Sequence, residues 1–465
     1  MSQSLPTQLK VLQAVSEVPE AAWDALVGED ASPFLEWQWL EALESSGSVA
    51  EASGWEPRHL TLWRGNRLVA AAPAYRKTDS SGEFVFDFSW ATASERAGVP
   101  YYPKLVIAAP LTPATGRRFL VAPGEDPKGR LLELARGALE LAREERLSSV
   151  HVLFPTEAEA VALEPLGFAV RHGVQYHFLN EGYRTPDDVL QRFNSKRRNQ
   201  LRRERRAPSE QGLTLRVLRG DALAAADPRE TFRLYASTVD KFAWGRRYLS
   251  PRFFTRVLDR FRHRVELVQA LSGDRVVAGA FNLASDRVLY GRYWGCFEEH
   301  PFLHFNVCLY AGMDEVVRRG LVRFEPGAGG EHKLVRGFTP SLTYSAHALF
   351  HRGLDRAVRS SSPTSGPPSR PGCRRGRRRP GSRTRRYADA RARESGHRGR
   401  HREQERAKAQ ASAALQGAVP QRQLHDPGFR GGGPSRGIPQ VRVRRGLDHA
   451  PCPQHGHRRG GGLYT

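Results

Sequence analysis

Two stretches of eight residues set the plan of this chain: GNRLVAAA at residues 65–72 and GDRVVAGA at residues 273–280. In each, a Gly-Asn or Gly-Asp pair precedes an apolar run, which is typical of a tight turn that leads into a β-strand. The two stretches lie at an offset of 208 residues, and in both halves helices precede the hairpin while strands and a helix follow it. The pattern predicts a duplicated unit. The alternative is two unrelated hairpins that look alike.

Helices and strands mix along both halves. An apolar strand is expected at residues 150–154. It follows a helix, expected from about residue 129 to 146, whose apolar residues recur at helical spacing: Leu131, Leu134, Ala135, Ala138 and Leu139. Ser32-Pro33 and Thr185-Pro186 are typical helix starts, because a hydroxyl caps free amides and proline suits the first turn. We therefore predict an α/β (α+β) fold with domains at residues 1–183 and 184–358.

The charge of the chain is concentrated at its C-terminal end. Residues 361–465 hold 24 Lys and Arg against 6 Asp and Glu, whereas residues 1–360 hold 48 against 43. Only 11 of the last 105 residues are Ile, Leu, Val, Met, Phe, Trp or Tyr, too few to offset chain entropy. We predict a disordered Arg/Gly/Pro-rich tail at 359–465. Two origins remain open: an arginine-rich RNA-binding element, or, as we favour, a frameshifted reading after Val358.

Cysteine content and apolar runs indicate the compartment. Four cysteines without CxxC spacing fit a reducing compartment and no zinc site. The first residues lack a signal-peptide pattern, and no apolar run approaches the length of a membrane-spanning helix. We expect a cytoplasmic protein without a transmembrane segment, a metal or a permanently bound cofactor.

Five separated blocks carry a resemblance to a known family. They are SPFLEWQWLEAL (32–43), EFVFDFSWATASERAG with YYPKL (83–105), FNSKRRNQLRRERR (193–206), GRYWGCFEEHPFLHFNVCLY (291–310) and GAGGEHKLVRGFTPSLTYSAH (327–347). Together they resemble the FemAB-like proteins of the acetyltransferase (GNAT) superfamily, which are connected with peptidoglycan. The resemblance covers roughly residues 32–358. It implies two tandem GNAT-type domains and acyl transfer to an amine, or transfer of an amino acid from a charged tRNA as in the related Fem aminoacyltransferases.

The block GAGGEHKLVRGF (327–338) is the strongest site candidate. Its glycines let the backbone approach a ligand closely. Acyl transfer to an amine needs a base for the ammonium proton, and Glu331 or His332 is the candidate. Lys333 and Arg336 are candidates to bind a carboxylate or phosphate of the substrate. The alternative is a polar hairpin with solvated charges, and the resemblance favours the site.

Other side chains are assigned with less support from the sequence. Tyr344 and His347 are candidate general acids for the leaving group, although a strand would place them on opposite faces. The substrate cleft, expected between the two domains, is predicted to include Trp294, Asp87, Tyr102 and Lys104. A packed structural role is the alternative for Tyr344, His347 and the aromatic Tyr102.

A dense basic run spans residues 193–206, with seven Lys or Arg and the single acid Glu204. On a helix, Arg198, Arg202, Arg205 and Arg206 would form one stripe. Like-charge repulsion favours an anion opposite this stripe, such as the phosphates of a tRNA, a nucleotide-linked precursor or a lipid carrier. The predicted anion ligands are Lys196, Arg198, Arg202 and Arg205. No base-reading motif is present, so sequence-specific DNA binding is not expected.

We therefore hypothesise an acyltransferase that acts on an amine of a cell-wall (peptidoglycan) precursor. The alternative is a non-catalytic module that binds such a precursor or another anionic ligand. Acetyl-CoA enzymes hold pyrophosphate on a glycine-rich loop at a helix N-terminus. The corresponding loops here, 121–130 and 300–304, are poor in glycine or rich in acid. This favours aminoacyl-tRNA, or another phosphate-rich carrier, over acetyl-CoA as the donor.

Overall fold

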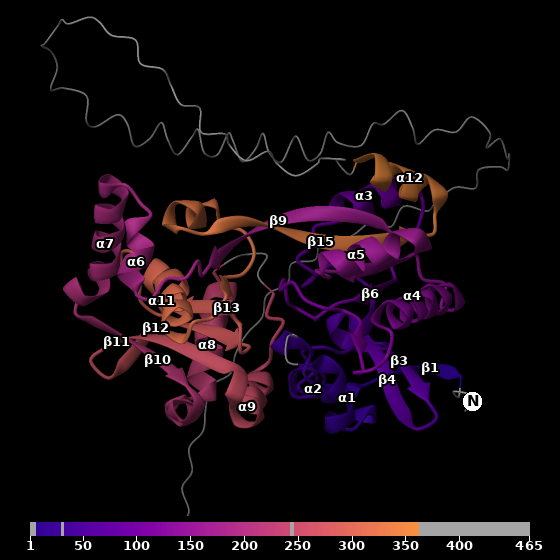
Figure 1. The fold of residues 1–465 in the computed structure, drawn as a ribbon, viewed down its shortest axis with the longest axis horizontal. Coiled ribbons are helices and arrows are strands. Elements are labelled where there is room, and N and C mark those ends of the chain that lie inside the picture. Colours follow the sequence, from indigo (N-terminus) through magenta and orange to yellow (C-terminus); the bar gives the residue numbers. More distant parts are fainter. Residues whose placement is uncertain (1–5, 29–31, 242–245, 362–465) are drawn as a thin grey trace, which may run out of the picture. The chain divides into compact units, whose positions relative to one another are not determined.

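The computed structural model describes residues 6–28, 32–241 and 246–361 (Figure 1). The predicted tail therefore lies outside the described residues from residue 362 on. The N-terminal strands are β1 (Thr7–Leu12), β2 (Trp55–Pro57), β3 (His59–Arg64), β4 (Arg67–Ala72), β5 (Ala74–Lys77), β6 (Lys104–Ile107), β7 (Leu120–Val121), β8 (Ser149–Leu153) and β9 (Ala169–Leu179). The helices among them are α1 (Glu20–Val27), α2 (Trp37–Ser45), α3 (Phe88–Arg96), α4 (Pro127–Glu144) and α5 (Glu157–Leu163).

The C-terminal half continues the same mixture. Its strands are β10 (Leu213–Arg219), β11 (Val265–Ser272), β12 (Arg275–Ala284), β13 (Val288–Cys296), β14 (Arg323–Glu325) and β15 (Thr339–Leu349). Its α-helices are α6 (Pro186–Gln191), α7 (Ser195–Glu210), α8 (Pro228–Val239), α9 (Pro251–Arg260), α10 (Leu303–Phe305), α11 (Ala311–Arg319) and α12 (Arg352–Ser361). A π-helical turn, η7 (Asn306–Tyr310), joins α10 to α11, and a 3-10 helix, η8 (Glu331–Arg336), precedes β15.

The strands of the described residues form two sheets. The smaller has the order β1-β3-β4-β7, and the larger has eleven strands in the order β10-β11-β12-β13-β14-β9-β15-β8-β6-β5-β2. In the larger sheet, β6 and β8 are parallel, as are β13 and β14. Parallel strands need a crossover; the first crossover contains α4, and the second contains α10, η7 and α11. The predicted mixed α/β class is confirmed.

The two predicted hairpins are present and share an irregularity. Gly65 and Gly273 take φ angles of 58° and 59° at the turns. In β3–β4 the register shifts between Leu62 and the next residue, and in β11–β12 it shifts at Ala270, which lies at the same 208-residue offset. A β-bulge changes the direction and twist of a strand. The hairpins therefore match in register as well as in sequence, which supports duplication over chance likeness.

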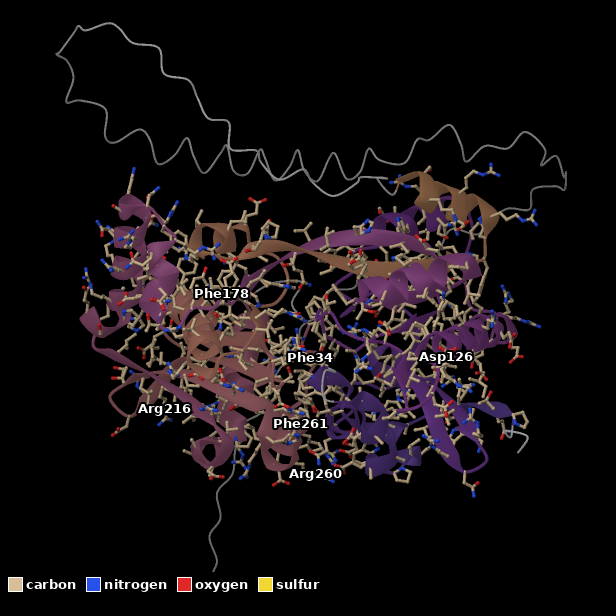
Figure 2. All side chains as sticks on the ribbon, viewed as in Figure 1. Phe34, Asp126, Phe178, Arg216, Arg260 and Phe261 are labelled. Carbon is tan, nitrogen blue, oxygen red and sulfur yellow. The ribbon has the colours of Figure 1, made fainter. Side chains whose placement is uncertain are left out.

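Of the two helix starts predicted at Ser32-Pro33 and Thr185-Pro186, the second is present and the first is not. Asp126 caps α4 by accepting a hydrogen bond from the Lys128 amide at 3.1 Å, and Thr185 caps α6 (Figure 2 labels Asp126). The helix expected to open at Ser32-Pro33 begins instead at Trp37, because Glu36 is extended with ψ of 144° and only a short 3-10 turn precedes it.

Strand β15 returns to the N-terminal half. It pairs antiparallel with β9 from Thr339 opposite His177 to His347 opposite Ala169, and its end also pairs with β8. Figure 1 shows β9 and β15 running together between the two halves. β15 thus joins both halves in one sheet. The predicted division at residues 183 and 184 therefore stays a prediction.

Aromatic side chains of both halves meet in a shared core. The ring centroids of Phe34 and Tyr290 are 5.2 Å apart, and Trp39 lies 5.1 Å from Phe253 and 5.9 Å from Phe261. All five side chains belong to one buried cluster, and Figure 2 labels Phe34 and Phe261. Such pairs add about 0.5–1.5 kcal/mol each beyond the area they bury. The halves are thus joined by packing as well as by β15.

Helix α8 packs directly on β13 at Gly295. A Cβ atom at this residue would lie 1.7 Å from the carbonyl oxygen of Leu234 and 2.3 Å from its carbonyl carbon. Both atoms are backbone, so the helix would have to move to make room. Glycine is therefore required here by the approach of α8 to the strand.

We expect Gly295→Ala to lower the free energy of unfolding by about 3 kcal/mol, as strong overpacking does. The matched control is Gly353→Ala in α12, where the added Cβ would meet a His351 side-chain atom at 3.2 Å. Alanine suits a helix better than glycine, so this variant should change by less than about 1 kcal/mol. Urea unfolding of the full chain measures both. Equal stability of the two variants would contradict the close packing of α8.

Candidate functional site

The predicted site residues lie in two places. Around the ends of β13 and β14 lie Trp294, Glu331, His332, Lys333 and Arg336, with α7 beside them. Around β6 and the start of α3 lie Asp87, Tyr102, Lys104 and His347. The four predicted catalytic residues are therefore not all brought together.

A glycine-rich turn brings η8 beside β13. The parallel pairing of β13 with β14 covers only three residues of each strand, and β13 then continues to Cys296 with β12 as its partner. The chain leaves β14 through Pro326, whose Cα would lie 3.2 Å from a Cβ at Gly291. Segment 327–337 then contains four glycines with positive φ: Gly327, Gly329, Gly330 and Gly337. Other residues rarely adopt this conformation.

Lys333 is buried in this turn. Its side chain donates hydrogen bonds from Nζ to the carbonyl oxygens of Gly327 at 2.9 Å and Pro326 at 3.4 Å. Within residues 6–28, 32–241 and 246–361 it forms no ion pair with a carboxylate, and only 5% of the residue is exposed. Burial lowers the pKa of Lys333 to about 8. The ammonium group can therefore lose its proton near neutral pH.

Aromatic rings and imidazoles lie next to Lys333. The ring of His304 lies 5.1 Å from Trp294 and 6.2 Å from His332, and Phe305 lies 5.6 Å from His332. The pKa of His332 is lowered first by its partial burial and then by the charges of Lys333 and Arg336. Both imidazoles are therefore biased toward the neutral form, in which one ring nitrogen accepts a hydrogen bond. Glu331 and His332 are both exposed on η8.

Arg336 is already paired inside the protein. Its Nε and Nη2 atoms each lie 3.0 Å from Oε2 of Glu204, and its guanidinium lies 3.5 Å from the ring centroid of Phe305. Tyr310 donates its hydroxyl to the same carboxylate oxygen at 2.5 Å. The sequence-based role of Arg336 as a substrate-carboxylate or phosphate ligand thus competes with a buried partner. In the sequence, Glu204 stands out only as the one acid in a basic run.

The basic helix α7 has an outer and an inner face. Lys196, Arg202, Arg203 and Arg206 are exposed, whereas Glu204 is buried. Arg205 departs from the predicted stripe, because it is half-buried and its Nη1 lies 2.9 Å from Asp314. Arg198 donates from Nη2 to the carbonyl oxygen of Phe193 at 3.0 Å. The exposed cations are therefore fewer than the sequence predicts.

The second place is a closed ionic network. Lys104 donates from Nζ to Asp87 at 2.5 Å, to Glu83 at 2.9 Å and to Ser80 at 2.9 Å. Burial raises the pKa of Glu83 to about 7. Tyr102 bonds to the same Ser80 hydroxyl at 2.7 Å and is half-buried. Because Asp87 and Lys104 are almost fully buried, they pair with each other and do not face solvent.

The two predicted general acids separate as strand alternation requires. His347 is buried, and its Nδ1 lies 2.6 Å from Nδ1 of His151. Burial lowers the pKa of His347 to about 3, which leaves it a neutral imidazole at physiological pH. Tyr344 lies on the other face of β15, with its ring 5.2 Å from His172.

Membrane and metal features complete the description. No helix in the described ranges combines the length and apolar character needed to cross a bilayer. The same residues contain no group of three His, Cys, Asp or Glu side chains arranged to hold a metal ion.

Comparison with known sequences identifies the family. A family model named FemAB-like, described as peptidoglycan biosynthesis/recognition, matches residues 14–363. The match covers most of the 465 residues, and the chain belongs to this family. No protein of curated function matches the sequence.

Several solved structures are similar to this chain at low identity. FemX is 14% identical, with a TM-score of 0.46, over 74% of this chain and 98% of FemX. L-PGS from Bacillus licheniformis is 9% identical, with a TM-score of 0.42, over 66% of this chain and 89% of that one. A tandem GNAT protein from the clavulanic acid biosynthesis pathway is 12% identical, with a TM-score of 0.39, over 74% and 98%.

We expect Lys333→Met to raise the free energy of unfolding by about 2 kcal/mol at pH 7, because the variant buries no charge. The pKa of Lys333 falls from 10.5 to about 8 on folding, so the folded state binds fewer protons than the unfolded state in this range. The free-energy cost of burying the Lys333 ammonium is therefore full below pH 8 and disappears as the pH rises toward 10.5.

Urea unfolding between pH 6 and pH 10 measures this difference. The advantage of Lys333→Met over the unmodified protein should shrink above pH 8. The control is Lys128→Met, at an exposed position of α4, which should show no such trend. A variant at position 333 that is less stable at pH 7 would contradict the burial of an unpaired ammonium.

Proposed function

We propose that this protein transfers an acyl or aminoacyl group to an amine of a peptidoglycan precursor. The family to which the chain belongs supports the choice of acceptor. The environment of Lys333 supports the chemistry, because two carbonyl oxygens hold its buried ammonium and no carboxylate pairs with it among the described residues. The protein has free thiols at Cys296 and Cys308, which fit a reducing compartment. We therefore place the reaction in the cytoplasm.

The reaction needs a base whose pKa lies near the working pH. An acceptor amine is protonated at neutral pH and must lose a proton before its nitrogen attacks the carbonyl carbon of the donor. The new C–N bond replaces the ester or thioester bond of the donor, and the leaving oxygen or sulfur takes up a proton. Lys333, with a pKa of about 8, is suited to accept the first proton. His332, whose pKa is lowered by partial burial, is the second candidate, and both His332 and Glu331 are exposed.

The loops before the crossover helices support a donor other than acetyl-CoA. In the first half, the loop contains Glu125, which pairs with Arg64 at 2.7 Å and Arg130 at 3.1 Å, and Asp126 already caps α4. A pyrophosphate there would meet two carboxylates. The exposed cations of α7 lie beside the proposed reaction site instead, since α7 packs on α10 and η7. We propose that they bind the phosphates of an aminoacyl-tRNA or a similar carrier.

Transfer assays with the full chain test the proposed reaction. The acceptor is an amine-bearing peptidoglycan stem peptide, offered with aminoacyl-tRNA or with acetyl-CoA. We expect kcat/KM to rise with pH through about 8 as the base loses its proton, and Lys333→Met to lower it about 100-fold or more. His332→Ala should have a smaller effect and Glu331→Ala little effect. Full activity of Lys333→Met would exclude this base, and binding without turnover by any donor would favour a recognition module.

A salt series tests the donor. We expect tRNA binding to weaken steeply with salt, and the double change Lys196→Gln with Arg202→Gln to reduce the slope of log K against log salt by about 0.7–0.9 for each lost phosphate contact. The control is Arg229→Gln, an exposed arginine of α8, which should leave the slope unchanged. Tight acetyl-CoA binding without RNA binding would overturn the proposed donor.

A further inference from the structure

We infer that Glu204 is a positioning residue, which holds the segment that carries Lys333 in its reactive arrangement. The inference rests on the proposed role of Lys333 as the base. Helix α7 then has two roles, because its outer face presents cations while its inner face fixes the geometry of the site. The carboxylate of Glu204 contacts three separate segments of the chain.

Glu204 points into the protein from the buried face of α7. It shares this face with Leu201, Ala207 and Pro208, and only 1% of Glu204 is exposed. Its Oε1 atom accepts a hydrogen bond from Gln200 at 2.9 Å, and its Oε2 atom accepts those of Arg336 and Tyr310. Every bond to the carboxylate thus comes from α7, η7 or η8.

Arg336 connects this carboxylate to both sides of Lys333. The guanidinium belongs to the residue three positions after Lys333, and it is held by Glu204 through Nε and Nη2. The third nitrogen, Nη1, donates to the carbonyl oxygen of His332 at 2.8 Å. Residues 332 and 336 are therefore anchored to the same guanidinium, and Lys333 lies between them.

The π-helical turn forms the facing wall of the site. Tyr310 ends this turn and bonds to Oε2 of Glu204, while Asn306 begins it and donates from Nδ2 to the backbone oxygen of Glu204 at 2.8 Å. Burial raises the pKa of Cys308, which lies between them, so its thiol stays neutral. Irregular turns of this kind often occur at functional sites. One residue of α7 thus fixes both walls around Lys333.

Stability alone does not account for the pair. A buried ion pair gains little net free energy over apolar side chains of similar size, because two charges lose their water. Removal of only one partner, in contrast, leaves an uncompensated charge and disturbs whatever the other partner holds. Here the remaining partner is Arg336, which holds the backbone on both sides of Lys333.

The reactivity of Lys333 toward acetic anhydride, measured by mass spectrometry across a pH series, tests the inference on the full chain. In the unmodified protein we expect half-maximal labelling near pH 8. In Glu204→Gln the segment loosens and water reaches Nζ, so the midpoint should rise by one pH unit or more. The matched control is Glu210→Gln on the same helix, an exposed side chain near Arg206, which should keep the midpoint near 8.

Two further measurements separate positioning from stability. The double change Glu204→Gln with Arg336→Gln should shift the midpoint no further than the single changes do, because both break the same connection. In the transfer assay, Glu204→Gln should lower kcat at least tenfold and leave KM for the donor unchanged, since the outer cations remain. Should Glu204→Gln fail to fold, Tyr310→Phe, which removes one bond to the same carboxylate, should give a smaller shift.

The outcomes distinguish this inference from the proposed function. A midpoint near 8 that does not move in Glu204→Gln or Tyr310→Phe overturns the positioning role, even where stability falls. A shifted midpoint without transfer activity toward any donor supports positioning and overturns the proposed function. Labelling of the unmodified protein at the ordinary lysine pKa overturns both.

Discussion

The cost of removing charge from water is the constraint around which the interior of this protein is arranged. Two carboxylates offset this cost for Lys104. For Arg118 it is offset by four hydrogen bonds to main-chain carbonyl oxygens. For Arg336 it is offset by Glu204. In the part of the chain that the structure describes, Lys333 has two carbonyl acceptors and no carboxylate partner. Unlike an arginine, a buried lysine can lose its proton. The least compensated cation of these four is thus the one best suited to acid–base chemistry.

The two crossovers differ where the candidate site lies. In the first half the crossover helix α4 runs without interruption from Pro127 to Glu144 and is capped by Asp126. In the second half the corresponding helix is interrupted by the π-turn η7. That turn supplies Tyr310 and Asn306 to the contacts of Glu204. The two hairpins match in register, whereas the crossover helices differ, since that of the second half contains the π-turn η7.

Local chemistry could be predicted from the sequence, and long-range pairing could not. The turns at Gly65 and Gly273 and the cap at Thr185 depend on neighbours within a few residues, so their patterns are visible in the chain. The burial of Glu204 depends on Arg336, which is 132 residues away. A basic run gives no sign of such a partner, because a solvated stripe and a helix with one inward acid share the same spacing. The pairing of Asp87 with Lys104 is likewise invisible in the sequence, although both residues are candidates there.

The position of β15 has a consequence for how the chain is made. β8 and β9 are complete once residue 179 has been synthesised, yet the strand that lies between them ends at Leu349. Until then, the growing chain carries two strand edges with unsatisfied amides and carbonyls, which invite pairing with other chains. During most of the synthesis of the second half, β8 and β9 therefore lack the strand that pairs with both of them. β15, the last described strand, fills this gap. A chain shortened before residue 339 would keep every residue of the first half and lose the strand that lies between β8 and β9.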